Sequence, residues 1–469
     1  MIRRFERAGR PGDFFEVEVQ GSNVIARSGP RGRDVITRTE AQASPVEAEA
    51  EMLRLVLSHL DRGFQEVAWQ PPGVLPELSE GARRLVQREA DAQAAAKERA
   101  AEVMAQWAIA STAANPALEA QCRAAAPDDE APWIVYTDFL ADHGDPRAEI
   151  AAAFRGGQPK AAMFTVGLHR KKLTGSQDAY TDFTFRHGFA VGAQVPNALH
   201  QTWKLHEVVA TLLASPMGTF LDALTCGLAS FGDDNDWRPT LEAVLASPIG
   251  ERLRVLNLNA YDYDDCMMHW VNMGDWSGVL DHLPKLEELR VRGDRVTYGT
   301  IDLPSLRVFA RESCTMKNEE LIALGEARWP ALERLELWFG SSHYAVNIDL
   351  HALDSIFAAH GLAKLRHLGL RNCDLHAAIV PVLSSSRLLR QLESLDLSGG
   401  TIATREVDIL VAHASDLRHL ATIDLTDNFI SVEDCRRLRG ALPNANVTKQ
   451  REDEDDDDDE PMRYVIEYE

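Results

Sequence analysis

The second half of this 469-residue chain repeats one pattern of leucines, and no other feature limits its fold as strongly. The pattern is L-x-x-L-x-L-x-x-N/C-x-L, where x is any residue. Two copies fill it completely, one at Leu365, Leu368, Leu370, Cys373 and Leu375 and the other at Leu420, Ile423, Leu425, Asn428 and Ile430. A third copy, with Gly400 in the polar position, runs through Leu392, Leu395, Leu397 and Ile402. Weaker copies start at Leu221, Leu253, Leu286, Leu306 and Leu332, and successive starts are 20 to 33 residues apart.

The gaps between copies hold stretches typical of a helix, such as NEELIALGEA (318–327) and VEDCRRLRGAL (432–442). This order resembles that of leucine-rich repeat proteins, and the resemblance implies a curved coil with parallel strands inside and helices outside. A single strand-helix unit has an apolar face too small to be stable alone, so neighbouring units must stack. We therefore predict an α/β, multi-domain chain with a leucine-rich repeat solenoid over residues 216–450.

The polar position of the repeat decides how the cysteines are interpreted. Cys314 and Cys373 fall in that position, which predicts buried thiols within the stack rather than nucleophiles, since a catalytic cysteine needs a base partner and an electropositive pocket. The six cysteines lie at least 40 residues apart, so neither a zinc site nor a disulfide framework is indicated. The sequence also lacks a Gly-rich phosphate loop, a nucleophile elbow and a helical H-E-x-x-H motif. We therefore expect no catalysis, no cofactor and no metal.

The residues that flank the inward leucines indicate a binding surface, because side chains alternate along a strand and these must point to the concave side. They are Glu288, Arg290, Arg292, Glu312, Arg334, Glu336, Trp338, His367, Arg371, Asp396 and Asp424. The early strands are basic and aromatic, and the late strands are acidic. An exposed tryptophan beside arginines is typical of interface hot spots. The residues predicted to bind a protein partner are Arg290, Arg292, Arg334, Glu336, Trp338, His367 and Arg371. The alternative is a solvated face with incidental ion pairs, such as one between Arg290 and Glu336.

The first 70 residues show a different pattern. Apolar residues alternate around a Gly-Ser-Asn turn in FFEVEVQGSNVIARSG (14–29), which predicts a hairpin, and a helix-forming stretch from Pro45 ends before Gly63. This order resembles the WGR domain, although Arg27-Ser28-Gly29-Pro30-Arg31-Gly32 keeps only one glycine of the Trp-Gly-Arg signature. Eukaryotic WGR domains contact DNA ends, so the resemblance implies nucleic-acid contact through Arg27, Arg31, Arg33 and Arg38.

Residues 71–114 form the next segment, which is rich in Ala, Arg, Glu and Gln with almost no Gly or Pro. Summed helix propensity predicts a long helix that acts as a spacer or packing arm. The alternative is a polar linker.

The segment DFLADHGDPRAEI (138–150) gathers five potential metal ligands or acid-base groups, yet its order is that of helix ends. Gly144 suits the left-handed conformation at a helix C-terminus, His143 suits the negative end of the helix dipole, and Asp145 can cap the next helix through its carboxylate. The run from Val135 to Arg147 resembles a small helical domain that accompanies leucine-rich repeats in myxobacterial and planctomycete proteins and has no established enzymatic activity. We assign it residues 115–165, followed by a connector with short strands at 166–215.

Two other segments stand out. DYDDCMMHWVNMGDW (262–276) lengthens the spacing between two repeats and either projects a binding loop or packs on the stack, since its acidic residues match no metal-binding frame. Residues 451–469 combine an acidic run, predicted to be disordered, with the β-prone end RYVIEYE. That end is either a docking peptide that adds a strand to a partner or to its own sheet edge, or part of a solubilising tail.

Charge argues against a protein that binds nucleic acid by bulk attraction. The net charge is −23, and residues 452–469 supply 11 acidic residues against Arg463, or −10, so the rest of the chain is only mildly acidic. No apolar run is long enough to span a bilayer, and the N-terminus is charged, which favours a cytoplasmic protein. We predict a bacterial, non-enzymatic scaffold or adaptor that binds a protein partner through the concave face. The alternatives are a nucleic-acid-sensing adaptor that uses the WGR-like domain and a regulatory target or substrate of an effector enzyme.

Overall fold

A computed structural model of the chain divides into two compact units, residues 1–110 and 111–469, which are described separately. The described residues are 2–7, 13–30, 36–61, 64–66, 113–175, 181–198, 201, 203–230, 235–258, 260–262, 264–341, 348–358, 360–452 and 463–466. Residues 71–112 of the predicted long helix at 71–114, and the acidic run at 453–462, lie outside them. Among the helices within them, none has both the length and the apolarity needed to cross a membrane.

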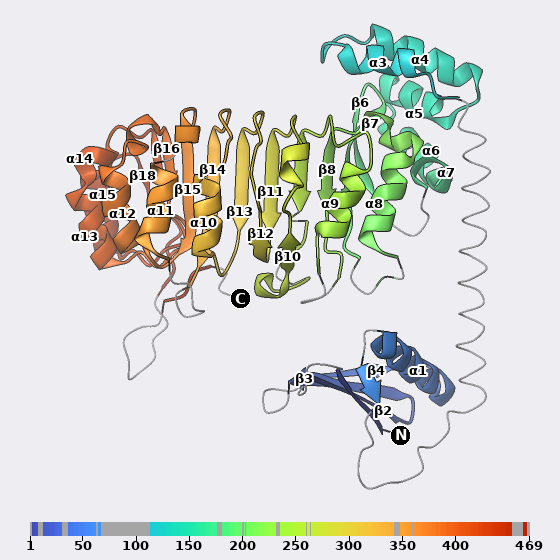
Figure 1. Ribbon diagram of the computed structural model, residues 1–469, viewed down its shortest axis with the longest axis horizontal. Coiled ribbons are helices and arrows are strands. Elements are labelled where there is room, and N and C mark those ends of the chain that lie inside the picture. The colour runs from blue at the N-terminus through green and yellow to red at the C-terminus, as the bar shows by residue number, and fades with distance from the viewer. Residues whose placement is uncertain are drawn as a thin grey trace. The chain divides into compact units, whose positions relative to one another are not determined.

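The first unit is a five-stranded antiparallel sheet in the order β4-β3-β2-β1-β5, with helix α1 (Pro45–Asp61) on one face (Figure 1). Its strands are β1 (Ile2–Arg7), β2 (Asp13–Gln20), β3 (Asn23–Pro30), β4 (Ile36–Ala41) and β5 (Phe64–Glu66). Phe5, Phe15 and Val17 pack against Met52 and Val56 of the helix, because alternate residues of a strand share one face. The predicted hairpin and helix are confirmed.

The second unit begins with five short helices, which we call the helical module. They are α3 (Pro116–Ala124), α4 (Ala131–Asp142), α5 (Pro146–Arg155), α6 (Pro159–Leu168) and α7 (Arg170–Thr174). Prolines stand in the first turn of α3 to α6, where the missing N–H costs no helical hydrogen bond. The core of the module includes Trp133, Tyr136 and Leu140 of α4 together with Phe189 and Phe220 from the neighbouring sheet region. The helical module is therefore packed against that sheet.

The rest of the unit is one eleven-stranded sheet whose strands follow each other in chain order (Figure 1). They are β6 (Asp182–Arg186), β7 (Phe189–Val195), β8 (Ala223–Cys226), β9 (Val255–Leu258), β11 (Glu288–Arg292), β13 (Val308–Glu312), β14 (Arg334–Gly340), β15 (His367–Cys373), β16 (Ser394–Asp396), β17 (Thr422–Asp424) and β18 (Ala445–Asn446). All pairings from β7 to β18 are parallel, and β6 adds an antiparallel edge. We call this sheet and its helices the ladder. Its first two strands lie within the segment predicted as a connector.

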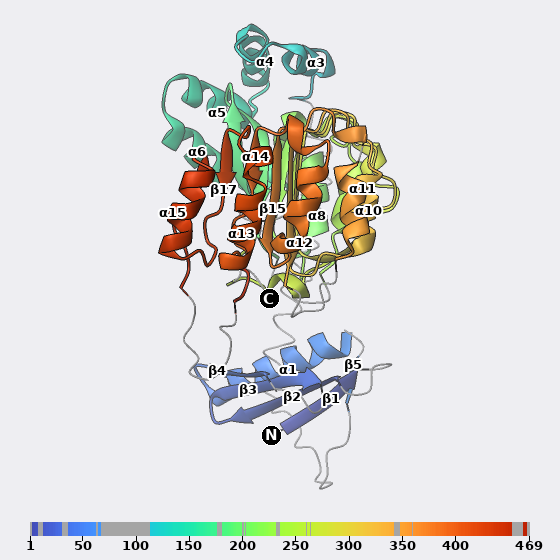
Figure 2. The same ribbon diagram turned by 90° about the vertical axis from the view of Figure 1, so that its left-hand side faces the viewer.

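Helices connect most of the ladder strands, and several helices that follow each other in the chain pack together; Figure 2 shows them in an end view. They are α8 (Leu205–Ala214), α9 (Arg238–Leu245), α10 (Asn318–Gly325), α11 (Leu350–Phe357), α12 (His376–Ser385), α13 (Thr404–Ala412), α14 (Ala414–Leu417) and α15 (Val432–Ala441). The inward leucines of the repeat form a single core between strands and helices. All eight predicted repeat starts, from Leu221 to Leu420, are at most 3% exposed.

The polar position of the repeat satisfies backbone groups inside this core. The amide nitrogen of Asn428 donates to the carbonyl oxygens of Leu397, Leu425 and Thr426, and its side-chain oxygen accepts from the N–H of Ile402. Buried backbone groups need such partners because water cannot reach them. Asn428 therefore ties neighbouring turns together inside the core, and Cys314 and Cys373 are buried and outside any disulfide, as predicted.

The lengthened spacing at 262–276 does not project from the ladder. Its residues form the 3-10 turn η4 (Met268–Trp270) and the strand β10 (Asn272–Asp275), which pairs in parallel with β12 (Asp294–Thr297) as a separate two-stranded sheet. Met268, Met273 and Trp276 are at most 1% exposed. Of the two interpretations of this segment, packing on the ladder is therefore correct.

Candidate functional site

The acidic segment at 138–150 positions two helices and does not form an acid-base centre. Gly144 has a φ of +64°, which ends α4 in the left-handed region that glycine adopts without strain. The Asp145 carboxylate accepts from the backbone N–H of Arg147 at 2.9 Å and so caps α5, while His143 is the C-cap of α4. Asp138 and Glu149 are exposed. Within the described residues, no three His, Cys, Asp or Glu side chains gather at metal-binding distance.

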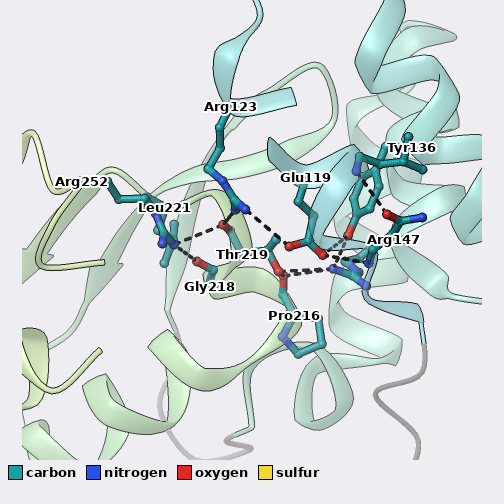
Figure 3. Close-up of polar contacts among 11 residues, drawn as sticks. Glu119, Arg123, Tyr136, Arg147, Pro216, Gly218, Thr219, Leu221 and Arg252 are labelled. Carbon is teal, nitrogen blue, oxygen red and sulfur yellow. Dashed lines mark hydrogen bonds and ion pairs between the residues drawn. The ribbon is translucent and has the colours of Figure 1, made fainter. Parts of the chain in front are cut away.

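The same segment joins the helical module to the ladder through Arg147 (Figure 3). This side chain is 8% exposed and forms an ion pair with Asp145 at 2.7 Å. Its Nη1 also donates to the Tyr136 hydroxyl at 3.3 Å and to the Pro216 carbonyl and Thr219 hydroxyl at 3.4 Å. Because the last two acceptors lie in η2 (Pro216–Phe220), Arg147 bonds across the joint. Burial lowers the pKa of this guanidinium, but Asp145 and its neighbours outweigh that effect and raise it overall.

Two further arginines strengthen this joint by binding backbone carbonyls of the same turn. Arg123 donates to the Thr219 oxygen at 3.1 Å, and Arg252 donates to the Gly218 and Thr219 oxygens at 3.0 and 3.1 Å. The carbonyls at the end of a short helical turn carry partial negative charge and favour cations. Arg147 of the Val135–Arg147 run, together with Arg123, therefore acts as a clamp between the helical module and the ladder.

The candidate partner-binding residues lie in three rows across the ladder strands, because parallel pairing brings corresponding positions together. The first row is Glu288, Val308, Arg334, His367, Ser394 and Thr422. The second row is Arg290, Ala310, Glu336, Gly369, Asp396 and Asp424. The third row contains Arg292 beside Glu312, and Trp338 beside Arg371. We call this surface, opposite the leucine core, the strand face.

Arg371 forms the densest group of contacts on the strand face. Its Nη1 donates to Glu336 at 2.6 Å, its Nε donates to the Ser398 hydroxyl at 2.9 Å and lies 3.4 Å from Asp396. Its guanidinium carbon is 4.9 Å from the centre of the Trp338 ring, a cation–π distance. Burial lowers the pKa of Arg371, but the two carboxylates raise it overall, so the guanidinium stays charged. Ion pairs from strand to strand are therefore part of this surface.

Two of the predicted site residues are not exposed, contrary to the expectation. Trp338 is 7% exposed and belongs to a small apolar cluster with Met268 and Cys314, against which Ile466 packs. Arg292 is 6% exposed, pairs with Glu312 at 2.7 Å and lies 5.4 Å from the Tyr261 ring centre. The covering residues come from the lengthened segment after β9 and from the end of the chain. A joint replacement of Arg292 and Trp338 would therefore disturb packing as well as any binding.

The remaining predicted residues stay accessible. Arg334 is exposed, and Arg290, whose side chain is 32% exposed, pairs with Glu288 on its own strand at 2.5 Å rather than with Glu336. His367 shares a 2.6 Å hydrogen bond with the Ser394 hydroxyl. Burial, followed by the nearby Arg334 charge, lowers the pKa of His367. The imidazole is therefore more often neutral near pH 7 than an ordinary histidine.

The sequence pattern missed one buried ion pair in the core. Arg311 occupies an inward position of β13, where it is fully buried, and its Nε donates to Glu320 of α10 at 3.0 Å. Its Nη1 binds the carbonyls of Gly293 and Glu312. A charged residue in a leucine position, followed nine residues later by a glutamate on a helix-forming stretch, is the signal that could have revealed it.

The arginines proposed for nucleic-acid contact differ in their surroundings. Arg27 pairs with Glu16 at 3.0 Å and Glu18 at 3.2 Å on the neighbouring strand, so its charge is balanced within its own sheet. Arg38 is exposed. Arg31 and Arg33 lie outside the described residues. Of the two described members of the predicted set, Arg38 is exposed and Arg27 is partly exposed but paired within its sheet.

No protein-family model and no curated protein matches the sequence. Several solved structures are similar to the chain, including the following three. A protein from Bacteroides fragilis is 17% identical with a TM-score of 0.49, over 96% of this chain and 97% of that one. An internalin from Listeria monocytogenes is 15% identical with a TM-score of 0.22, over 55% and 87%. An LRR protein from Leptospira interrogans is 17% identical with a TM-score of 0.22, over 51% and 68%. Since all three TM-scores lie below 0.5, we draw on this chain's own contacts for its function.

Proposed function

We propose that this chain is a non-catalytic adaptor of the leucine-rich repeat type, in which the ladder is a solenoid that holds a protein partner on its strand face. The observation that carries the proposal is the alignment of charged side chains in rows. The second row runs from Arg290 through Glu336 to Asp396 and Asp424, and Arg334 stands exposed in the first. Concave faces of stacked repeats are extended docking surfaces.

The distribution of charge defines the kind of partner. The strands β11 and β14 present Arg290 and Arg334, whereas β16 and β17 present Asp396 and Asp424. A partner that fits this surface carries acidic residues opposite the first pair and basic residues opposite the second. Complementary charge of this kind accelerates association and fixes the orientation of the complex.

The preformed ion pairs support a binding role. Arg371 is held by Glu336, Asp396 and Ser398 before any partner arrives, so its side chain loses little conformational freedom on binding. Arg371 also retains 25% side-chain exposure, which leaves donor capacity for a partner carboxylate. The N-terminal sheet and helix, as a WGR-like unit, would then serve as a second contact point in addition to the ladder.

Affinity capture with a charge-reversed pair tests this proposal. The full chain is immobilised and exposed to lysate of the native host, in parallel with the variant Arg290→Glu/Arg334→Glu. A specific partner should be retained by the unmodified chain and at least tenfold less by the variant, because two like charges now face its acidic residues. Retention should also weaken with added salt.

The matched control is Arg405→Glu, an exposed arginine on α13 that lies outside the strand face. This variant carries one charge reversal and should retain the partner unchanged. If the strand-face variant retains the same proteins as the unmodified chain, the strand face is not the binding surface and the proposal fails.

A further inference from the structure

The end of the chain returns to the ladder and lies against it. Val465 is only 1% exposed, and Ile466 packs on the apolar cluster formed by Met268, Cys314 and Trp338. The backbone N–H of Ile466 donates to the carbonyl oxygen of Gly399, in the loop after β16, at 3.0 Å. A side chain at Gly399 would meet Ile466, so the two segments approach as closely as a glycine permits. Residues 463–466, which we call the terminal peptide, therefore occupy a defined place.

The ends of the acidic stretch that precedes the terminal peptide lie close together. Before it, the Arg451 guanidinium lies 4.3 Å from the centre of the Phe429 ring and binds the Asp427 carbonyl. After it, the Arg463 guanidinium lies 5.8 Å from the same ring. The chain thus leaves and re-enters the ladder at one aromatic side chain. A polar end that could have stayed in solvent instead brings two aliphatic residues, Val465 and Ile466, to the carboxyl ends of the strands.

We propose that the cluster of Met268, Cys314 and Trp338, with the Gly399 carbonyl, is a peptide-binding site. Its ligand class is an extended peptide with two adjacent branched aliphatic residues, and the chain's own terminal peptide fills the site until a partner peptide replaces it. This inference deepens the proposed function and rests on it, since Trp338 lies beneath Arg371 on the strand face. Recognition uses the elements of extended-peptide binding, namely a main-chain hydrogen bond with pockets for side chains.

The contacts favour a ligand that exchanges. Ile466 donates one backbone hydrogen bond to the ladder, and its side chain is only partly buried. A tether holds even a weak ligand at an effective concentration on the order of millimolar, so the terminal peptide can stay bound without high intrinsic affinity. A partner peptide must compete with that local concentration. The terminal peptide therefore raises the affinity or concentration that a partner needs in order to bind at Trp338.

The test uses a labelled peptide with the sequence of residues 461–469, PMRYVIEYE, and measures its fluorescence anisotropy with two full-length proteins. One is the unmodified chain, and the other carries Val465→Asp/Ile466→Asp, which should vacate the site. The labelled peptide should bind the variant at least tenfold more tightly than the unmodified chain. A peptide with the same two aspartate substitutions should bind neither. Equal binding to both proteins, or to neither, would overturn the proposal.

Two further variants keep the result specific. If the double aspartate variant does not fold, Ile466→Ala in the full chain replaces it, with the same expected direction. Within the vacated chain, Met268→Asp should abolish peptide binding, whereas Arg405→Glu, on α13 and outside the strand face, should leave it unchanged. Since the probe is the chain's own sequence, its failure to bind would reject the peptide site alone, and unchanged partner capture by the charge-reversed pair would reject the strand-face function alone. The oligomeric state gives a further outcome. A fraction of dimer that increases with protein concentration would show that terminal peptides exchange between copies and would overturn occupation within one chain.

Discussion

Two arginines on strands of the same sheet lie in opposite surroundings. Arg311 on β13 points into the leucine core, is fully buried and pairs with Glu320, which is 3% exposed. Arg371 on β15 points to the strand face, keeps 25% side-chain exposure and pairs with Glu336 and Asp396. Arg311 stands in the row of Val291 and Leu337, so it replaces an apolar residue of the core. Arg371 stands beside Trp338.

The difference shows that position along the strand decides what an ion pair does. Inside the core, both charges lose water, and their attraction must offset a large desolvation cost, so losing one partner is severe. On the strand face, water still screens the pair, and the same residue type remains available to a partner. Burial raises the pKa of Glu320 against the attraction of Arg311, which is the direction expected for a carboxylate without access to solvent. The leucine side of the sheet carries stability, whereas the ion pair of Arg371 on the strand face keeps partial access to solvent.

The largest expected effect comes from removing one partner of the core pair. Glu320→Leu leaves the Arg311 charge buried without its counter-ion, and we expect a loss of about 3–5 kcal/mol in the free energy of unfolding. Urea unfolding of the full chain, followed by circular dichroism, measures it. The double variant Arg311→Leu/Glu320→Leu, which makes the row apolar throughout, should recover most of that loss. A double variant as unstable as the single one would show that the pair has a role that a leucine cannot fill.

Two histidines extend the same comparison to the pH dependence of stability. His376, at the start of α12, is 1% exposed, and burial lowers its pKa to about 4 from 6.5. The unfolded chain therefore binds a proton near pH 6 that the folded chain excludes, so stability falls as pH drops from about 6.5 toward 4. Between pH 7.5 and 5 this histidine should account for a loss of about 2 kcal/mol. Urea midpoints at the two pH values measure the loss.

The strand-face histidine provides the control for that measurement. His376→Phe should flatten the pH dependence of the urea midpoint in this range. His367→Gln should change it much less, because His367 is only partly buried, and that partial burial and the nearby Arg334 charge lower its pKa. An unaltered pH profile in His376→Phe would place the acid sensitivity elsewhere in the chain.

Most of the ladder could be predicted from its leucines, because their spacing reports which side chains must be buried together. The helix ends at 138–150 were equally predictable, since Gly144 and Asp145 act on their own backbone neighbourhood. The bonds from Arg147 to Pro216 and Thr219 were not, because they join segments about 70 residues apart by position and not by pattern. The helix-end signals could be recognised in the sequence, but the role of Arg147 as a clamp could not.

The sequence predicted which residues point to the strand face but not which of them other segments cover. Alternation placed Arg290, Arg334 and Arg371 correctly on the side opposite the leucines. It could not show that Tyr261, Met268 and Ile466 lie over Arg292 and Trp338, because these covering residues come from an irregular segment and from the far end of the chain. Side-chain periodicity determines the direction in which a residue points, and exposure also depends on what packs above it.

The smallest effect on stability, and the sharpest contrast with the core pair, is expected from Arg371→Leu. This change removes the ion pairs to Glu336 and Asp396, but those carboxylates keep partial access to water, so the loss should be about 1 kcal/mol or less in the free energy of unfolding. Leucine retains apolar contact with Trp338, which limits the packing cost. Urea unfolding beside Glu320→Leu gives the comparison directly, and the matched change Arg334→Leu, at an exposed strand-face position, sets the baseline. If Arg371→Leu lowered the free energy of unfolding as much as Glu320→Leu, the ion pairs of the strand face would serve stability, as the core pair does. That result would count against a role for Arg371 in binding a partner.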